Sequence, residues 1–223
     1  MNAAFIANME RILWLYTLAL DPEFPVVCFD ERPCFLIGDT IDPIAMQTGK
    51  VAKENYAYQK NGSCALLAAI EPLTGKRLAQ VHGQRTKKEY AIFMKELAQQ
   101  YPQATKIRLV QDNLNTHNIS SFYENLPADE AFELAQRFEF FYTPKSASWL
   151  NMIEIEFSAL SRQCLNRRIP TQELLEKEVL TIVKERDNQY TKIDWQFSIK
   201  KARKKLNRHY DKVNTSNSKF KET

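Results

Sequence analysis

Three acidic residues stand where short apolar segments end or a helix is expected to begin. Asp30 closes the run 25–30, Asp112 follows the run 107–111, and Glu154 lies in the first turn of a helix predicted after a loop. A carboxylate at the edge of an apolar core is costly unless it binds a cation or a hydrogen-bond donor. Three converging carboxylates form a hard oxygen site for Mg²⁺ or Mn²⁺, and two such ions can activate a water or a 3′-hydroxyl for phosphodiester displacement.

Each acid also has a purely structural interpretation. Asp30 could cap a turn beside Arg32. Asp112 could begin an Asx turn with Asn113, and Glu154 could complement the dipole of a helix N-terminus. One such acid alone favours the structural interpretation, whereas the three together, in this order and with these flanks, favour a catalytic site.

The pattern of apolar residues predicts the elements that must position these acids. Strands are expected at 25–30, 63–70, 77–82, 107–111 and 138–142, and helices at 3–20, 86–101, 114–137 (with a break near Pro127), 152–165, 171–190 and 194–206. Residues 32–60 are mixed and could form a strand or a loop excursion. This order indicates an α/β fold, with one mixed five-stranded sheet flanked by helices.

Charge is distributed unevenly along the 223 residues. The net charge is +4, but residues 1–159 carry 15 Lys and Arg against 19 Asp and Glu, whereas residues 160–223 carry 16 against 8. A basic C-terminal third predicts a polyanionic partner such as nucleic acid; the alternative is a solvated, lysine-rich helix face. No segment approaches the ~20 apolar residues that cross a bilayer, so no membrane partner is expected.

The four cysteines, Cys28, Cys34, Cys64 and Cys164, show no zinc-finger spacing. Buried thiols of this kind favour a reducing, cytoplasmic setting. The cysteine pattern therefore predicts a cytoplasmic protein.

Four stretches of the sequence resemble the catalytic domain of DDE transposases, in the mariner-like bacterial insertion-sequence branch. They are VVCFDE (26–31), EPLTGKRLAQV (71–81), IRLVQDNLNTHN (107–118) and FYTPKSASWLNMIEIEFSALSRQCLNRR (141–168), within a resemblance that spans roughly residues 24–210. The resemblance implies an RNase H-like, retroviral-integrase-like fold that cuts DNA with two Mg²⁺ (or Mn²⁺) ions held by an Asp/Asp/Glu triad. Carried onto this sequence, the catalytic and metal-binding residues are Asp30, Asp112 and Glu154.

The third acid must be chosen between two glutamates. Glu154 and Glu156 are two residues apart, about 200° around a helix, so both cannot face one site. Ile153 and Phe157 mark the buried face, and either glutamate could flank it. In the family pattern the acid comes directly after three residues, which are Asn, any residue and an aliphatic residue. This pattern favours Glu154.

Two features depart from the family pattern. The 41 residues from 113 to 153 exceed the spacing of eukaryotic mariner enzymes, and the segment 123–136 accounts for the excess as an elaborated helix. Residues 1–24 are too few for the helix-turn-helix modules that precede such catalytic domains. We therefore expect a catalytic half, from a split reading frame, a truncated element or a relic, with a separately encoded helix-turn-helix half as a possible partner.

The expected organisation has four parts. They are an N-terminal helix or linker remnant (1–23), an RNase H-like catalytic domain (24–190), a basic C-terminal helix (191–212) and a disordered tail (213–223).

Candidate DNA contacts follow from charge and aromaticity near the expected site. They are Lys145, Trp149, Asn151, Arg162, Arg167, Arg168, Lys201 and Lys204. Lysine and arginine side chains could bind phosphates, and Trp149 could stack on a base. For Trp149 the alternative, a core plug that holds its loop, is slightly favoured. Asn113 could orient Asp112, and His117 could lie behind the metal ligands.

The resemblance to DDE transposases implies a transposase catalytic domain, in a cytoplasmic protein that is bacterial and is nucleoid-associated when on DNA. The resemblance implies metal-dependent cleavage at transposon ends, strand transfer into target DNA, and a synaptic complex with DNA that contains a homodimer or more. Two alternatives remain open: an RNase H-like nuclease without strand transfer, and a truncated inactive remnant that only binds DNA or a partner subunit.

Overall fold

A mixed sheet forms the centre of the computed structural model, which describes residues 1–41, 48–49 and 55–221. In this part of the chain the five strands lie in the order β3-β2-β1-β4-β5. Their bounds are β1 Val26–Asp39, β2 Tyr58–Ile70, β3 Arg77–His82, β4 Ile107–Gln111 and β5 Phe138–Tyr142. Strands β1, β2 and β3 pair antiparallel, whereas β4 pairs parallel with both β1 and β5. The mixed α/β sheet predicted from the sequence is therefore confirmed.

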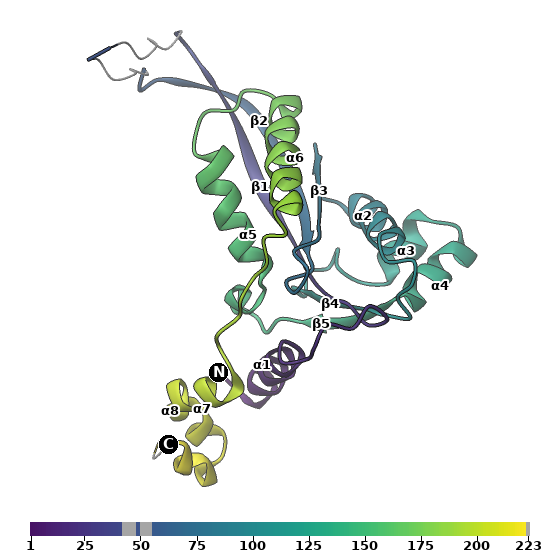
Figure 1. Cartoon of the computed structure of the whole chain (residues 1–223), viewed down its shortest axis with the longest axis vertical. Helices are drawn as coiled ribbons and strands as arrows, with labels where there is room; N and C mark the ends of the chain where they lie inside the picture. The colour runs from purple at the N-terminus through teal and green to yellow at the C-terminus, as the bar shows by residue number, and fades with distance from the viewer. Residues whose placement is uncertain (42–47, 50–54, 222–223) are drawn as a thin grey trace.

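Helices cover both faces of the sheet (Figure 1). One face packs against α1 (Ala3–Leu15), α5 (Ile153–Leu160) and α6 (Gln172–Asn188), and the other against α2 (Lys87–Gln99), α3 (Ser120–Asn125) and α4 (Ala128–Gln136). Alternation along β1 divides its side chains between two cores, with Cys28 on the α1 side and Val27 and Phe29 on the α2 side.

Several helix boundaries follow the local signals in the sequence. Thr86 caps α2, and its side chain forms a capping box with Glu89. The predicted break near Pro127 separates α3 from α4. Helix α5 continues as one π-helical turn over Ser161–Leu165, within the predicted helix 152–165.

The first strand is much longer than predicted. β1 continues past Asp30 to Asp39, so this acid lies within a strand and does not close one. Strands β1 and β2 form a long hairpin that reaches away from the rest of the sheet (Figure 1). The proline at 33 is tolerated because β4 pairs, among the described residues, only with Val26–Cys28, which leaves that edge of β1 free at the proline. Parts of the predicted 32–60 excursion, at 42–47 and 50–54, lie outside the described residues.

The basic C-terminal segment is broken into short helices. The single helix expected at 194–206 is instead α7 (Ile199–Lys205), followed by α8 (Asn207–Val213). A 3-10 helix at Thr215–Lys221 occupies most of the tail expected to be disordered. The segment is tied to α1, because Arg203 donates two hydrogen bonds of 2.8 Å to the carboxylate of Glu10. In the described part of the chain, no helix is long and apolar enough to span a membrane.

Candidate active site

Asp30 and Asp112 meet because β1 and β4 run parallel. The ladder between these strands ends at the pair Cys28 and Val110, and Asp30 and Asp112 each lie two residues further along. Side chains two residues apart along a strand point to the same face of the sheet. Both acids therefore emerge on the face covered by α1 and α5. Both line one cleft of about 530 Å³, together with Asn113, Tyr142 and the loop 143–148.

The environment of Asp30 disfavours an isolated negative charge. Burial, together with the neighbouring charges of Asp112 and Glu154, raises the pKa of Asp30 to about 7, against the opposing effects of the Glu31 backbone amide and of His117. That amide donates a 2.8 Å hydrogen bond to Asp30 Oδ1. A cation placed among these carboxylates would offset the cost of the buried negative charge and the repulsion between the carboxylates. The sequence predicted a cation site here for the same reason.

Asp112 is held by a buried imidazole. Its Oδ1 atom is hydrogen-bonded to His117 Nδ1, and His117 Nε2 lies 3.2 Å from Glu31 Oε1. Burial alone would lower the pKa of His117, but its contacts with Asp112 and Glu31 raise that pKa to about 9. The imidazole is thus a cation beneath the acidic cleft.

The two glutamates of α5 have different environments. Glu154 is exposed in the first turn, whereas the Glu156 side chain is 2% exposed. Glu156 accepts hydrogen bonds from Arg186 at 2.9 and 3.0 Å and from Arg77 at 3.1 Å. Glu156 therefore joins α5 to β3 and α6, and only Glu154 is available to a ligand.

The three predicted acids do not close into one cluster. Glu154 is near enough to raise the pKa of Asp30, but it is missing from the described side chains that line the cleft. Over residues 1–41, 48–49 and 55–221, no three His, Cys, Asp or Glu side chains converge closely enough to hold a metal ion. The donor set of Asp30 and Asp112, hard oxygens sharing one cleft, fits a divalent cation, and the charge of Glu154 acts on Asp30 from nearby.

The predicted DNA contacts near the cleft have three different environments. Lys145 is exposed and lines the cleft. Trp149 is 43% exposed and packs edge-on against Phe197, with ring centroids 5.5 Å apart, so the prediction of a core plug is wrong. Asn151 is only 1% exposed and donates to the Phe29 carbonyl at 2.8 Å. Asn151 therefore anchors its loop to β1 and is no DNA contact.

Two of the three predicted arginines are engaged within the chain. Arg167 forms a 2.6 Å ion pair with Glu178. Arg168 pairs with Asp39 at 2.5 Å and donates to the carbonyls of residues 55 and 57, which fixes the long hairpin to the segment after α5. Arg168 was predicted to contact DNA, but its side chain is instead held by these contacts within the chain.

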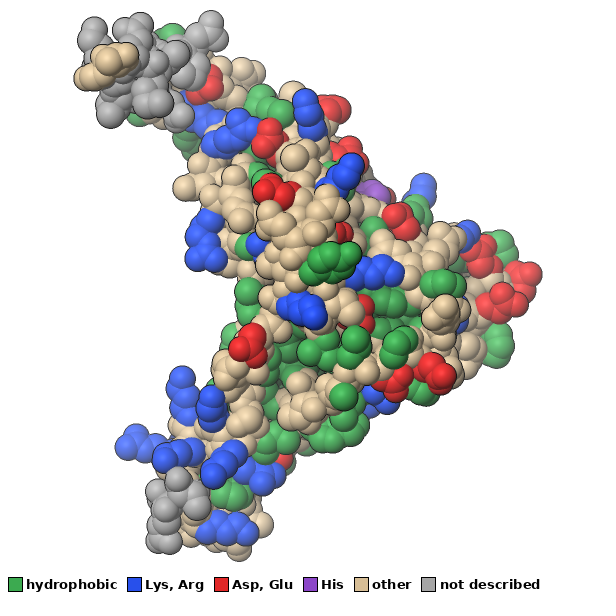
Figure 2. Space-filling model, in the orientation of Figure 1, with side chains coloured by type: hydrophobic (Ala, Val, Ile, Leu, Met, Phe, Trp, Pro, Cys, Tyr) green, Lys and Arg blue, Asp and Glu red, His purple; other side chains and the backbone are tan. Residues whose placement is uncertain are grey.

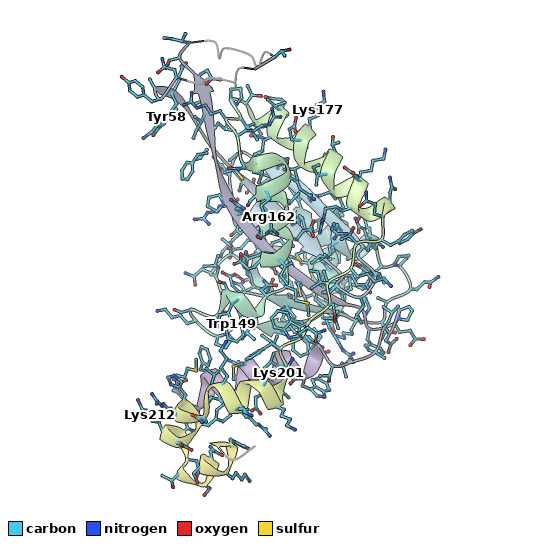
Figure 3. All side chains as sticks on the ribbon, turned by 60° about the vertical axis from the view of Figure 1, so that its left-hand side comes forward. Tyr58, Trp149, Arg162, Lys177, Lys201 and Lys212 are labelled. Atoms are coloured by element: carbon cyan, nitrogen blue, oxygen red, sulfur yellow. The ribbon has the colours of Figure 1, made fainter. Side chains whose placement is uncertain are left out.

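Arg162, Lys201 and Lys204 are exposed. Lys201 donates to the Gln196 carbonyl at 2.7 Å. Figure 3 shows Arg162, Trp149 and Lys201 following one another down the molecule.

Asn8 is among the cleft residues that the sequence did not point to. Asn8 of α1 lines the 530 Å³ cleft and also a neighbouring cleft of about 460 Å³ between α1 and Pro144–Lys145. Helical periodicity indicates that Asn8 lies on the exposed side of α1, since Met9 and Ile12 are buried. Periodicity carries no signal for what that side faces, because the docking of α1 depends on residues far away in the sequence.

Comparisons with known proteins agree with this geometry. The chain belongs to the DDE superfamily endonuclease family, whose sequence pattern matches residues 25–176. Its fold resembles the Mos1 mariner paired-end complex with Mn (TM-score 0.56, 13% identity, 85% of this chain and 58% of that chain). It also resembles a pre-cleavage Mos1 transpososome (TM-score 0.55, 13% identity, 95% and 61%). The sheet and its helices are thus RNase H-like, as expected. The chain spans about three fifths of these proteins, and no curated protein matches its sequence.

The same substitution should destabilise the protein at one glutamate of α5 and have little effect at the other. Glu156→Gln leaves Arg77 and Arg186 facing a neutral amide in a buried site, and breaking such a pair costs about 3 kcal/mol or more. We expect the melting temperature to fall by about 10 °C. Glu154→Gln, in the same turn but exposed, should shift it by less than about 2 °C. Thermal melts in EDTA compare the two, and equal losses would contradict the assignment.

Asp30→Asn should stabilise the metal-free protein in a pH-dependent way. Because the pKa of Asp30 is raised to about 7 on folding, its ionisation destabilises the folded state increasingly from about pH 4 to pH 7. The asparagine variant should therefore melt higher than wild type at pH 8 in EDTA, with the difference vanishing near pH 4. Asp194→Asn, at an exposed position, is the matched control. A lower melting temperature at pH 8 would identify Asp30 as a structural residue.

Proposed function

We propose that this chain is a transposase catalytic domain, which cleaves DNA phosphodiester bonds at transposon ends and joins the freed 3′ ends to target DNA. The observation that carries this proposal is the placement of Asp30 and Asp112 side by side in one cleft of a DDE-family chain. Membership of that family supports the chemistry, and the likeness to Mos1 assemblies supports transposon ends as the substrate.

Divalent ions, Mg²⁺ or Mn²⁺ and two in number, would be held by Asp30 and Asp112, with Glu154 completing the ligand set. Bound there, such ions supply an activated oxygen nucleophile and stabilise the leaving oxygen. The protein's own contribution is orientation: the Glu31 amide holds Asp30, and His117 holds Asp112. Asn151 fixes the loop that precedes Glu154 to β1.

The path of the DNA follows the clefts and the basic surface. The acidic cleft adjoins the second cleft through Asn8, Pro144 and Lys145, which line both. Beyond it, Lys and Arg side chains gather over the lobe formed by α7 and α8 (Figure 2). We assign the phosphate contacts to Lys145, Arg162, Lys201 and Lys204, with Trp149 on a base.

The remaining partners are part of the same proposal. Strand transfer at two transposon ends requires a synaptic complex with at least two copies of this chain. A separately encoded helix-turn-helix half would supply recognition of the terminal repeats. The proposed site of action is DNA in the bacterial cytoplasm.

Cleavage should depend on the proposed acids and on metal. With Mg²⁺ or Mn²⁺ and DNA carrying the element's ends, Asp112→Asn and Glu154→Gln should each lower nicking at least 100-fold, because each removes a metal ligand. Glu176→Gln, at an exposed position on α6, is the control and should retain wild-type activity.

Equal nicking in wild type and both acid variants would overturn the catalytic assignment. Pre-cleaved ends then separate the enzyme classes. Joined products support a transposase, whereas hydrolysis alone indicates an RNase H-like nuclease. DNA binding without either reaction indicates an inactive remnant.

Two neighbouring arginines should differ in DNA binding. Arg162 is exposed, whereas Arg167 is paired with Glu178. Loss of one phosphate contact reduces the slope of log affinity against log salt by about 0.9, so we expect this change for Arg162→Ala. Arg167→Ala should leave the slope unchanged. Titrations of fluorescent duplex DNA at several salt concentrations measure both, and equal slopes in the two variants would contradict the proposed DNA path.

A further inference from the structure

Glu31 carries a buried carboxylate on the side of the sheet away from the cleft. It follows Asp30 along β1, so alternation directs its side chain toward the α2 face, where Phe29 also lies. The Glu31 side chain is 6% exposed. A carboxylate so buried needs a positive or hydrogen-bonding partner, and His117 Nε2 lies 3.2 Å from its Oε1 atom.

His117 is fixed in place by its surroundings. Its side chain is 1% exposed, stacks on Tyr90 with ring centroids 5.0 Å apart and meets the edge of Phe29 at 5.2 Å. The side-chain amide of Gln111 donates to the backbone carbonyl of His117 at 3.0 Å. With ring and backbone both held, Nδ1 is kept beneath the carboxylate of Asp112, to which it is hydrogen-bonded.

Glu31 is thereby connected to both cleft acids. Its backbone amide donates to Asp30, and its side chain contacts the imidazole that holds Asp112. Among the described residues, the last backbone pair between β1 and β4 comes before the two acids. The contacts of Glu31 and His117 therefore link the two strands at the level of Asp30 and Asp112, where backbone pairing has ended.

We propose that Glu31 and His117 are positioning residues, which together set the separation and orientation of Asp30 and Asp112 for a divalent cation. The inference rests on the proposed function for the identity of the ligand. Neither residue faces the cleft, and each acts through a carboxylate that does. Residues placed behind metal ligands in this way commonly change metal affinity 10- to 100-fold when they are replaced.

Isosteric variants of His117 separate positioning from packing. The asparagine amide reaches the place of Nδ1, so His117→Asn keeps a donor for Asp112. The glutamine amide reaches the place of Nε2, so His117→Gln keeps the Glu31 contact and leaves Asp112 without its donor. We expect His117→Gln to weaken Mn²⁺ binding at least 10-fold and His117→Asn to weaken it less than about 3-fold.

A double-variant cycle tests Glu31. We expect Glu31→Ala to weaken Mn²⁺ binding about 10-fold, Glu31→Gln to retain most of it through its remaining acceptor oxygen, and Glu31→Ala to add little in the His117→Gln background. Electron paramagnetic resonance of free Mn²⁺ measures binding without DNA, and the Mn²⁺ concentration for half-maximal nicking measures it in the reaction. Thermal melts record stability separately, and Glu176→Gln is the control.

Each outcome decides the proposal. Equal Mn²⁺ affinity in His117→Gln and His117→Asn, or losses that multiply in the double variant, would overturn it even if every variant melts lower. A wild type that binds no Mn²⁺ would overturn it as well. A wild type that binds Mn²⁺ with the expected order of variants but cleaves no DNA would support the positioning and refute the proposed function, so the two claims fail separately.

Discussion

The short parallel pairing between β1 and β4 is the constraint on which the site depends. Among the described residues it is formed by Val26–Cys28 with residues 108–110, and it sets the level at which the two strands reach their acids. A slip of one residue would turn one acid to the opposite face of the sheet. The register is protected by burial, because Val27 and Leu109 belong to one core while Cys28 and Val110 belong to the other.

Placing carboxylates together costs stability, and the fold offsets that cost locally. Burial and like charges oppose ionisation of Asp30, while the backbone amide of Glu31 and the His117 cation on the α2 side of the sheet reduce that penalty. The result is a site in which negative charge is held in place but only partly neutralised. This arrangement suits a divalent cation, since its binding would relieve the repulsion between carboxylates that the fold retains.

Local signals in the sequence predicted much of this arrangement, and long-range packing explains what they missed. Apolar runs gave β4 and β5 their correct bounds, and Thr86 predicted the start of α2. The length of β1 could not be inferred, because Pro33 is tolerated where, among the described residues, β4 no longer pairs with that edge of β1. The structural roles of Asn151 and Arg168 depend on partners more than 100 residues away in the chain, which no periodicity reveals.

Helical periodicity alone left both glutamates of α5 as candidates for the third acid, and buried ion pairs in the structure distinguish them. Arg77 and Arg186 fix Glu156 inward, and the helical rotation of about 200° then directs Glu154 outward. Within the part of the chain that the structure describes, no side-chain hydrogen bond or ion pair holds Glu154, so a cation would have none to displace there and none draws Glu154 into the cleft. The two aspartates are set by the sheet and the glutamate by a helix docked on it. We therefore expect Glu154, the proposed third ligand, to be the one whose position responds to metal, while Asp30 and Asp112 remain fixed.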